Sequence, residues 1–369
     1  MTRELTIADR RLADDTDCFV IAEIGHNHQG NVRTAMQMFE SAADCGVDAV
    51  KLQKRDNRGL YTRPMYEKPY DNENSFGATY GAHREALELG RVEYEELKAY
   101  AAELGLVFMA TAFDEASADF LERLDVPAYK VASGDLRNTP LLEHIASFGK
   151  PMIVSTGAAQ LEDVRRAYNS VMPINPRLAI LQCTAAYPAD FDQLDLRVIE
   201  TYRALFPDLV IGLSGHDNSI SVAVAAYVLG ARILEKHFTL NRAMKGTDHA
   251  FSLEPVGMKK LVRDLKRTRV SLGDGVKKTY PGEASALVKM GKKLVAARAL
   301  PAGHVVTPGD VSARSPGDGL APYELGRIVG RSLRRPLAEQ EAFSFEVLDG
   351  AADARTSGDG RATGRTSST

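Results

Sequence analysis

The sequence predicts an α/β protein built as a (β/α)8 TIM barrel followed by a small β-rich domain. Short apolar runs typical of buried strands alternate with helix-period segments over roughly the first 270 residues. Near residue 284 this alternation stops, and turn-rich stretches such as PAGHVVTPGD and RSPGDGLAPYEL take over. No G-x-G-x-x-G follows a strand, which disfavours a doubly wound dinucleotide-binding sheet.

Eight strands and the helices between them account for the barrel. The strands are expected at 18–25, 49–53, 107–113, 128–133, 151–156, 178–183, 209–216 and 233–239. Helix-period segments include 32–46, 92–105, 116–125, 161–171 and 221–230, several ending at a Gly. Strand alternating with helix implies parallel, right-handed crossovers. Eight units are more than the five or six strands usual in an open sheet.

The chain divides into five parts by composition. They are an N-terminal segment (1–16), the barrel (17–272), a linker (273–290), the β-rich domain (291–350) and a tail (351–369). Short strands are expected at 293–300 and 332–338 in the β-rich domain. The tail lacks large apolar residues and is expected to be disordered.

Charge and cysteine content limit the possible partners and compartments. Lys plus Arg (46) nearly balance Asp plus Glu (49), so nothing points to nucleic acid or an anionic membrane. The three cysteines, Cys18, Cys45 and Cys183, lie far apart in apolar runs and are expected to be reduced, as in the cytoplasm. We find no signal-peptide h-region and no run of about 18 apolar residues.

The connection at 55–91 is unusually long and polar. Loops of this length are commonly lids or binding loops, and the alternative is a tolerated surface insertion.

Polar residues at the strand ends point to an active site, because barrel enzymes place their chemistry at that end. Lys51 and Lys130 stand on strands two places apart, and a lysine inside a strand is costly to bury without an anion. Hydroxyl donors accompany them at Thr111, Ser133, Ser155 and Ser214. The pattern predicts a site for phosphate, carboxylate or both. The alternative is that each lysine forms a structural ion pair with a carboxylate on a neighbouring strand.

His216 and His237 end adjacent strands, so their imidazoles can converge on one metal ion with open positions for water and substrate. A hard or borderline divalent ion fits best: Mn²⁺, Mg²⁺ or Co²⁺. Glu23, on the first strand, can act there as an acid or base or hold a substrate hydroxyl. Alternatively it forms a salt bridge to Lys51 or Lys130.

An ordered set of motifs resembles the sialic acid synthase family, the phosphoenolpyruvate-condensing nonulosonate synthases. The motifs are AEIGHNHQG, VKLQ, AYKVASGD, KPMIVSTG, QCTAAYP, IGLSGH, EKHFTL and KGTDHAFSLEP. VAARALPAGHVVTPGDV and SPGDGL resemble the antifreeze-protein-like (SAF) domain of those enzymes. The likeness runs from about residue 17 to 348.

The resemblance implies a metal-dependent condensation of phosphoenolpyruvate with an open-chain N-acetylated amino sugar, such as N-acetylmannosamine, to give a nine-carbon α-keto acid and phosphate with C–O cleavage. By this carry-over the ion is held by His216 and His237, with Mn²⁺ expected first. Glu23 and Gln53 lie beside the reacting carbons. Phosphoenolpyruvate is held by Lys51, Thr111, Lys130, Ser133, Ser155 and Ser214. The resemblance also implies a domain-swapped homodimer in which the SAF domain of one subunit covers the barrel mouth of the other.

The residues expected around the sugar are Asp135, Tyr187, Asp248 and Arg314. Here the sequence departs from the family pattern. Asp135 stands where a Glu is common, Gly215 replaces an Asp that is often present, and Ala185 replaces a polar residue. Ser315 replaces an arginine in the SAF motif, so the sugar-reaching arginine is either Arg314 or absent. The leading hypothesis is therefore a nonulosonate synthase, and the alternatives are a synthase for a different aldose and a non-catalytic sugar-binding barrel.

Overall fold

The computed structural model describes residues 3–350. It divides into two compact units, one that runs to Asp274 and one that begins at Gly275. Residues 351–369, for which the sequence predicts disorder, lie outside the described residues.

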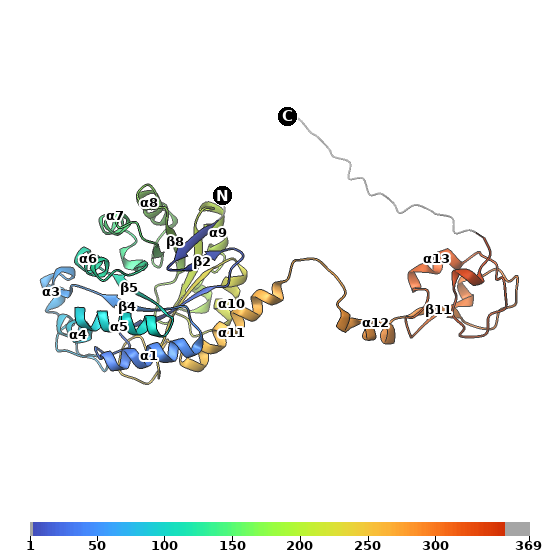
Figure 1. The fold of residues 1–369 in the computed structure, drawn as a ribbon, viewed down its shortest axis with the longest axis horizontal. Coiled ribbons are helices and arrows are strands. Elements are labelled where there is room, and N and C mark those ends of the chain that lie inside the picture. The colour runs from blue at the N-terminus through green and yellow to red at the C-terminus, as the bar shows by residue number, and fades with distance from the viewer. Residues whose placement is uncertain (1–2, 351–369) are drawn as a thin grey trace, which may run out of the picture. The chain divides into compact units, whose positions relative to one another are not determined.

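The first unit is a closed barrel of eight parallel strands, as the sequence predicts (Figure 1). The strands follow one another in chain order, and the last pairs with the first to close the ring. They are β3 (Phe19–Gly25), β4 (Ala49–Lys54), β5 (Val107–Ala112), β6 (Tyr129–Val131), β7 (Met152–Ser155), β8 (Leu178–Cys183), β9 (Val210–Gly215) and β10 (Ile233–His237). Every residue of β3 is buried, which explains why its sequence is apolar throughout except at Glu23.

Helices surround this barrel (Figure 1). Those between and after the strands are α1 (Val32–Cys45), α5 (Arg91–Glu103), α6 (Glu115–Arg123), α7 (Thr139–Ser147), α8 (Leu161–Val171), α9 (Val198–Leu205), α10 (Ser221–Val228) and α11 (Pro255–Leu272). Local sequence sets their ends. The side chain of Asn31 accepts a hydrogen bond from the N–H of Thr34 at the start of α1, and Gly46 ends that helix with a φ of 79°.

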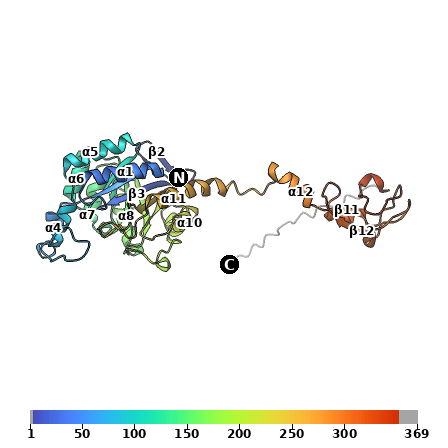
Figure 2. The ribbon, with the colours of Figure 1, turned by 90° about the horizontal axis from the view of Figure 1, so that it is seen from below.

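The long connection at 55–91 folds into three short helices before α5. They are α2 (Asn57–Leu60), α3 (Arg63–Tyr66) and α4 (Tyr80–Leu87). Figures 1 and 2 both place α4 at one end of the barrel and the N-terminal segment at the other. The connection is therefore an ordered layer at the end where the strands finish.

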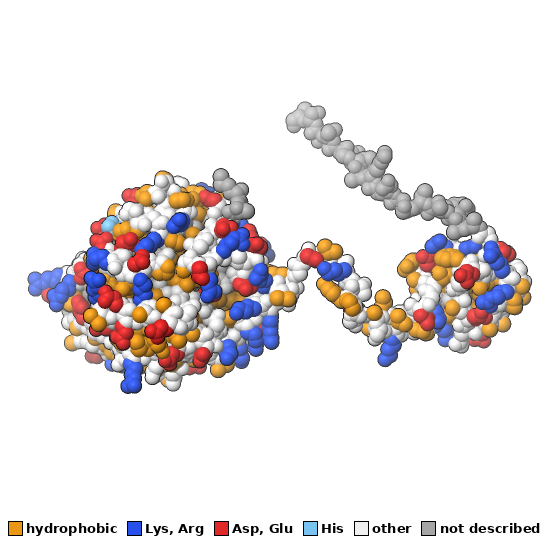
Figure 3. All heavy atoms as spheres, in the orientation of Figure 1, with side chains coloured by type: hydrophobic (Ala, Val, Ile, Leu, Met, Phe, Trp, Pro, Cys, Tyr) orange, Lys and Arg blue, Asp and Glu red, His pale blue; other side chains and the backbone are white. Residues whose placement is uncertain are grey.

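The surface of the barrel unit mixes both signs of charge. Figure 3 shows acidic and basic side chains interspersed over its visible face. Among the described residues, no helix is long and apolar enough to cross a membrane.

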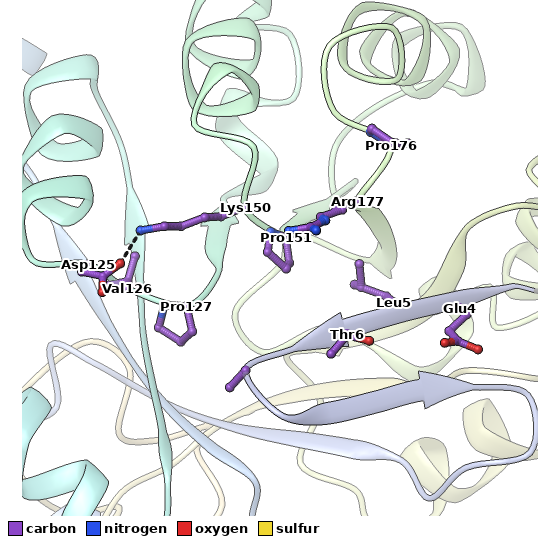
Figure 4. A pocket seen from close by; sticks show the side chains of 11 residues that line it. Glu4, Leu5, Thr6, Asp125, Val126, Pro127, Lys150, Pro151, Pro176 and Arg177 are labelled. Carbon is purple, nitrogen blue, oxygen red and sulfur yellow. Dashed lines mark hydrogen bonds and ion pairs between the residues drawn. The ribbon is translucent and has the colours of Figure 1, made fainter.

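The N-terminal segment forms an antiparallel hairpin that the sequence analysis did not predict. Its strands are β1 (Glu4–Ile7) and β2 (Arg10–Ala13). Leu5, Ile7 and Leu12 are buried and pack in one cluster with inward-facing barrel residues such as Ile21 and Met109. Figure 4 shows the hairpin beneath the segments that lead into the strands. The hairpin closes the end of the barrel opposite α4.

The second unit contains α12 (Ala284–Met290), a two-stranded antiparallel sheet of β11 (Lys293–Ala296) and β12 (Val311–Arg314), and the short helix α13 (Leu325–Ile328). A strand was predicted at 332–338, and this prediction is wrong. The segment forms only isolated bridges, such as Leu300 with Leu337. Pro336 has no N–H to donate, which interrupts a continuous ladder.

Candidate active site

The strand ends surround a pocket of about 670 Å³. All predicted site residues except Asp135 and Arg314 line it: Glu23, Lys51, Gln53, Thr111, Lys130, Ser133, Ser155, Tyr187, Ser214, His216, His237 and Asp248. A hollow of about 810 Å³ lies beside the hairpin at the other end of the barrel. Its lining holds several prolines and a Lys150–Asp125 ion pair of 2.7 Å (Figure 4), with none of the converging catalytic groups of the first pocket.

Four buried charged residues form the inner end of the pocket: Glu23, Lys51, Lys130 and Glu235. We call them the inner quartet. The Nζ of Lys51 lies 2.7 Å from Glu23 and 3.7 Å from Glu235, and the Nζ of Lys130 lies 3.8 Å from Glu235. The two lysine charges are thus matched by two carboxylates of the protein itself. The ion-pair alternative considered for the lysines is therefore present in the structure.

Hydroxyl groups complete the surroundings of the inner quartet. Lys51 donates to the Oγ1 of Thr111 at 2.7 Å, and Lys130 donates to the Oγ of Ser155 at 2.6 Å. The hydroxyl of Ser214 donates to Glu235 at 3.2 Å, while the other carboxylate oxygen of Glu235 is buried without a hydrogen-bond partner. The lysines and hydroxyl groups therefore surround the two carboxyl groups, and they can also bind the anionic groups of a substrate.

The two carboxyl groups of the inner quartet differ in proton affinity. Burial raises the pKa of Glu23 above its ordinary value, and the neighbouring Glu235 adds to this against the charge of Lys51. Burial opposes ionisation of Glu235 too, but the charges of Lys130 and Lys51 outweigh it and lower the pKa of this carboxyl. Glu235 therefore loses its proton more readily than Glu23, and Glu23 is the more easily protonated carboxyl of the two. Glu235 was not selected as a site residue in the sequence analysis.

The two predicted metal-binding imidazoles converge at the same mouth. The ring centroids of His216 and His237 are 5.4 Å apart. The Nδ1 of His216 donates to the carbonyl of Thr184 at 2.8 Å, which leaves the lone pair on its Nε2. The Nδ1 of His237 is buried with no hydrogen-bond partner among the described residues, and Asp248 lies 3.7 Å from it.

These features fit a divalent ion with two protein ligands. A buried imidazole nitrogen without a partner is costly unless something binds it. Residues 3–350 contain no group of three or more His, Cys, Asp or Glu placed to hold a metal, so water or substrate must supply the remaining positions. Tyr187 covers this region, and the centroid of its ring lies 4.2 Å from the ring centroid of His216.

A buried pair beside the histidines was missed by the sequence analysis. Lys236 donates to the Oδ2 and the carbonyl of Asp217, each at 2.7 Å. These residues follow His216 and precede His237, so the pair ties the two strand ends together. A Cβ at Gly215 would meet Asp217 at 3.0 Å and Lys236 at 3.1 Å. The glycine noted as a departure thus makes room for a carboxylate two positions later.

Two predicted sugar-binding residues are not part of this pocket lining. Asp135 lies in a short turn after β6, where burial raises its pKa and Asn138 lies 3.5 Å away. Arg314 ends β12 in the second unit. Two arginines that the sequence analysis did not select do line the pocket: Arg55 after β4 and Arg84 on α4. We call them the outer arginine pair.

Comparison with known proteins finds one family across most of the chain. A model described as the NeuB family matches residues 38–277, and one described as the SAF domain matches residues 293–346. N-acetylneuraminate-9-phosphate synthase of Homo sapiens is 40% identical over 334 residues, which cover 90% of this chain and 93% of the relative. N,N'-diacetyllegionaminic acid synthase of Legionella pneumophila is 34% identical over 338 residues, which cover 90% of this chain and 95% of the relative. A crystal structure of N-acetylneuraminic acid synthetase from Leptospira borgpetersenii in complex with citrate matches with a TM-score of 0.68 and 29% identity, covering 78% of this chain and 96% of that chain.

Proposed function

The chain belongs to the NeuB family, and from this premise we propose that it is a nonulosonate synthase. In the proposed reaction it condenses phosphoenolpyruvate with the aldehyde of an N-acetylated amino sugar, either N-acetylmannosamine or a relative. The observation that carries the proposal is the convergence of the inner quartet and two imidazoles in one pocket of about 670 Å³. The human and Legionella relatives are named for acylated acid sugars of this class, one phosphorylated and one not.

The proposed reaction forms one C–C bond and breaks one C–O bond. C3 of phosphoenolpyruvate attacks the sugar aldehyde, whose oxygen takes up a proton and becomes a hydroxyl. Water adds at C2, and phosphate leaves with the former enol oxygen and one proton. Three carbons from phosphoenolpyruvate and six from the sugar give a nine-carbon α-keto acid, in which the sugar C6 becomes C9.

The inner lysines and hydroxyls hold phosphoenolpyruvate in this proposal. Lys51 and Lys130 bind its anionic groups together with Thr111, Ser133, Ser155 and Ser214. Because both lysines already face carboxylates, binding a further anion favours the neutral form of Glu23, the carboxyl whose pKa burial raises. Protonated Glu23 then delivers its proton to the aldehyde oxygen. The side-chain amide of Gln53 donates to Glu23 at 2.6 Å and fixes its orientation.

His216 and His237 would hold the divalent ion, Mn²⁺ first with Mg²⁺ and Co²⁺ as alternatives, which when bound supplies Lewis-acid polarisation of the aldehyde. Tyr187 and Asp248 line the same side of the pocket and bind the sugar hydroxyls.

A phosphate-release assay tests the proposal. Purified protein is incubated with phosphoenolpyruvate and a panel of aldoses, with Mn²⁺ or with EDTA. We expect release only when phosphoenolpyruvate, an amino-sugar aldehyde and a divalent ion are all present. His237→Ala should remain folded by circular dichroism and lose both activity and Mn²⁺ binding by calorimetry. No release from any N-acetylated hexosamine, phosphorylated or not, would contradict the proposal.

A further inference from the structure

The outer arginine pair carries two positive charges with no carboxylate partner, one buried at Arg55 and one partly buried at Arg84. Arg55 is 7% exposed, and among residues 3–350 no carboxylate oxygen lies within 4.0 Å of the guanidinium of Arg55 or Arg84. Glu88 faces Arg55 but is paired with Lys54 at 2.8 Å, and Asp248 lies nearer to His237, at 3.7 Å. Buried charges are normally paired or bind a ligand.

The groups that contact the outer arginine pair are neutral. Arg55 stacks on the ring of Phe113, 3.6 Å from its centroid, and donates to the Oε1 of Gln53 at 2.7 Å. Arg84 donates twice to the hydroxyl of Tyr80, at 3.1 and 2.9 Å. These contacts fix both guanidiniums in position and leave their charge uncompensated.

His26 lies between the two arginines in an arrangement that cannot satisfy both. Its Nε2 is 3.0 Å from Arg55 and its Nδ1 is 3.1 Å from Arg84. A neutral imidazole has one acceptor nitrogen and an imidazolium has none, so at most one contact is a hydrogen bond. Burial, followed by the charges of Arg55 and Arg84, holds the pKa of His26 well below its ordinary value. The second contact sets N–H against N–H, and an anion accepting from both groups would relieve this conflict.

From this geometry we propose that the outer arginine pair binds the phosphate monoester of a phosphorylated acceptor sugar. The inference rests on the proposed function and specifies its substrate class: an N-acetylated amino sugar 6-phosphate. A phosphate offers three terminal oxygens to the two guanidinium forks, which suits this cluster of donors.

The position of the pair explains why the phosphate belongs to the acceptor rather than to phosphoenolpyruvate. The amide of Gln53 contacts Glu23 on one side and Arg55 on the other, so one side chain separates Arg55 from the inner quartet. Phosphoenolpyruvate reacts at the inner quartet, where lysines and hydroxyls serve its anions. The sugar C6 is the carbon farthest from the reacting aldehyde, and a phosphate there extends away from the inner quartet.

The experiment compares N-acetylmannosamine with N-acetylmannosamine 6-phosphate at saturating phosphoenolpyruvate and Mn²⁺. We expect wild-type kcat/KM to be at least about tenfold higher for the phosphorylated sugar, since hydrogen bonds to charged groups contribute strongly. Arg55→Met and Arg84→Met should each lower kcat/KM for the phosphorylated sugar by about 10- to 100-fold. The loss should be at least about tenfold greater for the phosphorylated sugar than for the unphosphorylated sugar, and it should exceed any rise in the KM for phosphoenolpyruvate. Arg63→Ala is the matched control, an arginine in the same connection whose side chain is 86% exposed.

Each other outcome has a definite meaning. Wild-type preference for the unphosphorylated sugar would overturn this inference while leaving the proposed function intact, and the wild-type comparison needs no variant to fold. If the arginine variants raise the KM for phosphoenolpyruvate instead, the pair serves that substrate and the inference fails. Equal losses with both sugars, with a lowered melting temperature, would show a structural role and overturn it. Absence of turnover with both sugars would remove the proposed function itself.

Discussion

The inner quartet and the outer arginine pair line one pocket but differ in how their positive charges are balanced. In the inner quartet, two lysines face two carboxylates, with the closest contact at 2.7 Å. In the outer pair, two guanidiniums face a phenyl ring, an amide, a tyrosine and a histidine. The difference separates charges that the fold itself neutralises from charges left for a ligand. Removing a member of each group should therefore have different effects on stability.

The largest expected effect comes from breaking the balance of the inner quartet. Lys130→Met leaves Glu235 with a single lysine, Lys51, which also pairs with Glu23. We expect a loss of about 3 kcal/mol in the free energy of unfolding. Activity should fall by about 10²- to 10³-fold. Urea denaturation and phosphate release measure the two effects. The double variant Lys130→Met with Glu235→Gln should regain stability but not activity. Equal instability of the double variant would show that charge balance is not the cause.

The Lys236–Asp217 pair tests whether a matched pair outside the pocket behaves differently. Lys236→Met leaves Asp217 buried without its lysine and should lower stability by about 2–3 kcal/mol. Because the pair ties the two histidine-bearing strand ends, Mn²⁺ affinity should weaken by about 10- to 100-fold, as measured by calorimetry. The KM for phosphoenolpyruvate should be unchanged. A changed phosphoenolpyruvate KM with normal Mn²⁺ affinity would argue against this positioning role.

The pH dependence of stability sharpens the comparison within the inner quartet. The pKa of Glu23 is raised by folding, so its contribution is complete below the ordinary value of 4.5 and is lost as the pH rises through the raised value. Wild type should therefore lose stability relative to Glu23→Gln as the pH increases above 4.5. Denaturation at several pH values checks this, and a constant difference would contradict it.

The smallest expected effect on stability is at the outer arginine pair. Arg84→Met removes a partly buried charge that has no carboxylate partner, together with two hydrogen bonds to Tyr80. These contributions oppose each other, so the free energy of unfolding should change by less than about 1 kcal/mol. Differential scanning calorimetry measures the change. A loss comparable to that of Lys130→Met would erase the distinction between the two groups.

Strand periodicity predicted the barrel and most of the pocket, because side chains at the ends of parallel strands must share one rim. Lys51, Lys130, His216 and His237 all follow this rule. The pairing between them did not follow from the sequence, since Lys51 could meet a substrate anion or a carboxylate on another strand. The structure shows both Glu23 and Glu235 in that role.

Strand periodicity could not predict the residues that tertiary packing brings to the pocket or to the barrel end. Arg84 reaches the pocket because α4 folds back over the strand ends, and no local signal in the 55–91 connection fixes that placement. The hairpin was missed because its four-residue strands carry charges between Leu5, Ile7 and Leu12. In the second unit, Pro336 interrupts the strand that was predicted at 332–338. The partner of β11 is β12 instead.

The hairpin of β1 and β2 has a consequence for traffic through the barrel. Its leucine and isoleucine side chains pack against the inward-facing barrel residues and close the interior below the catalytic groups. Within residues 3–350, the hairpin end therefore offers no path through the barrel interior, and the catalytic groups are reached from the mouth beside α4.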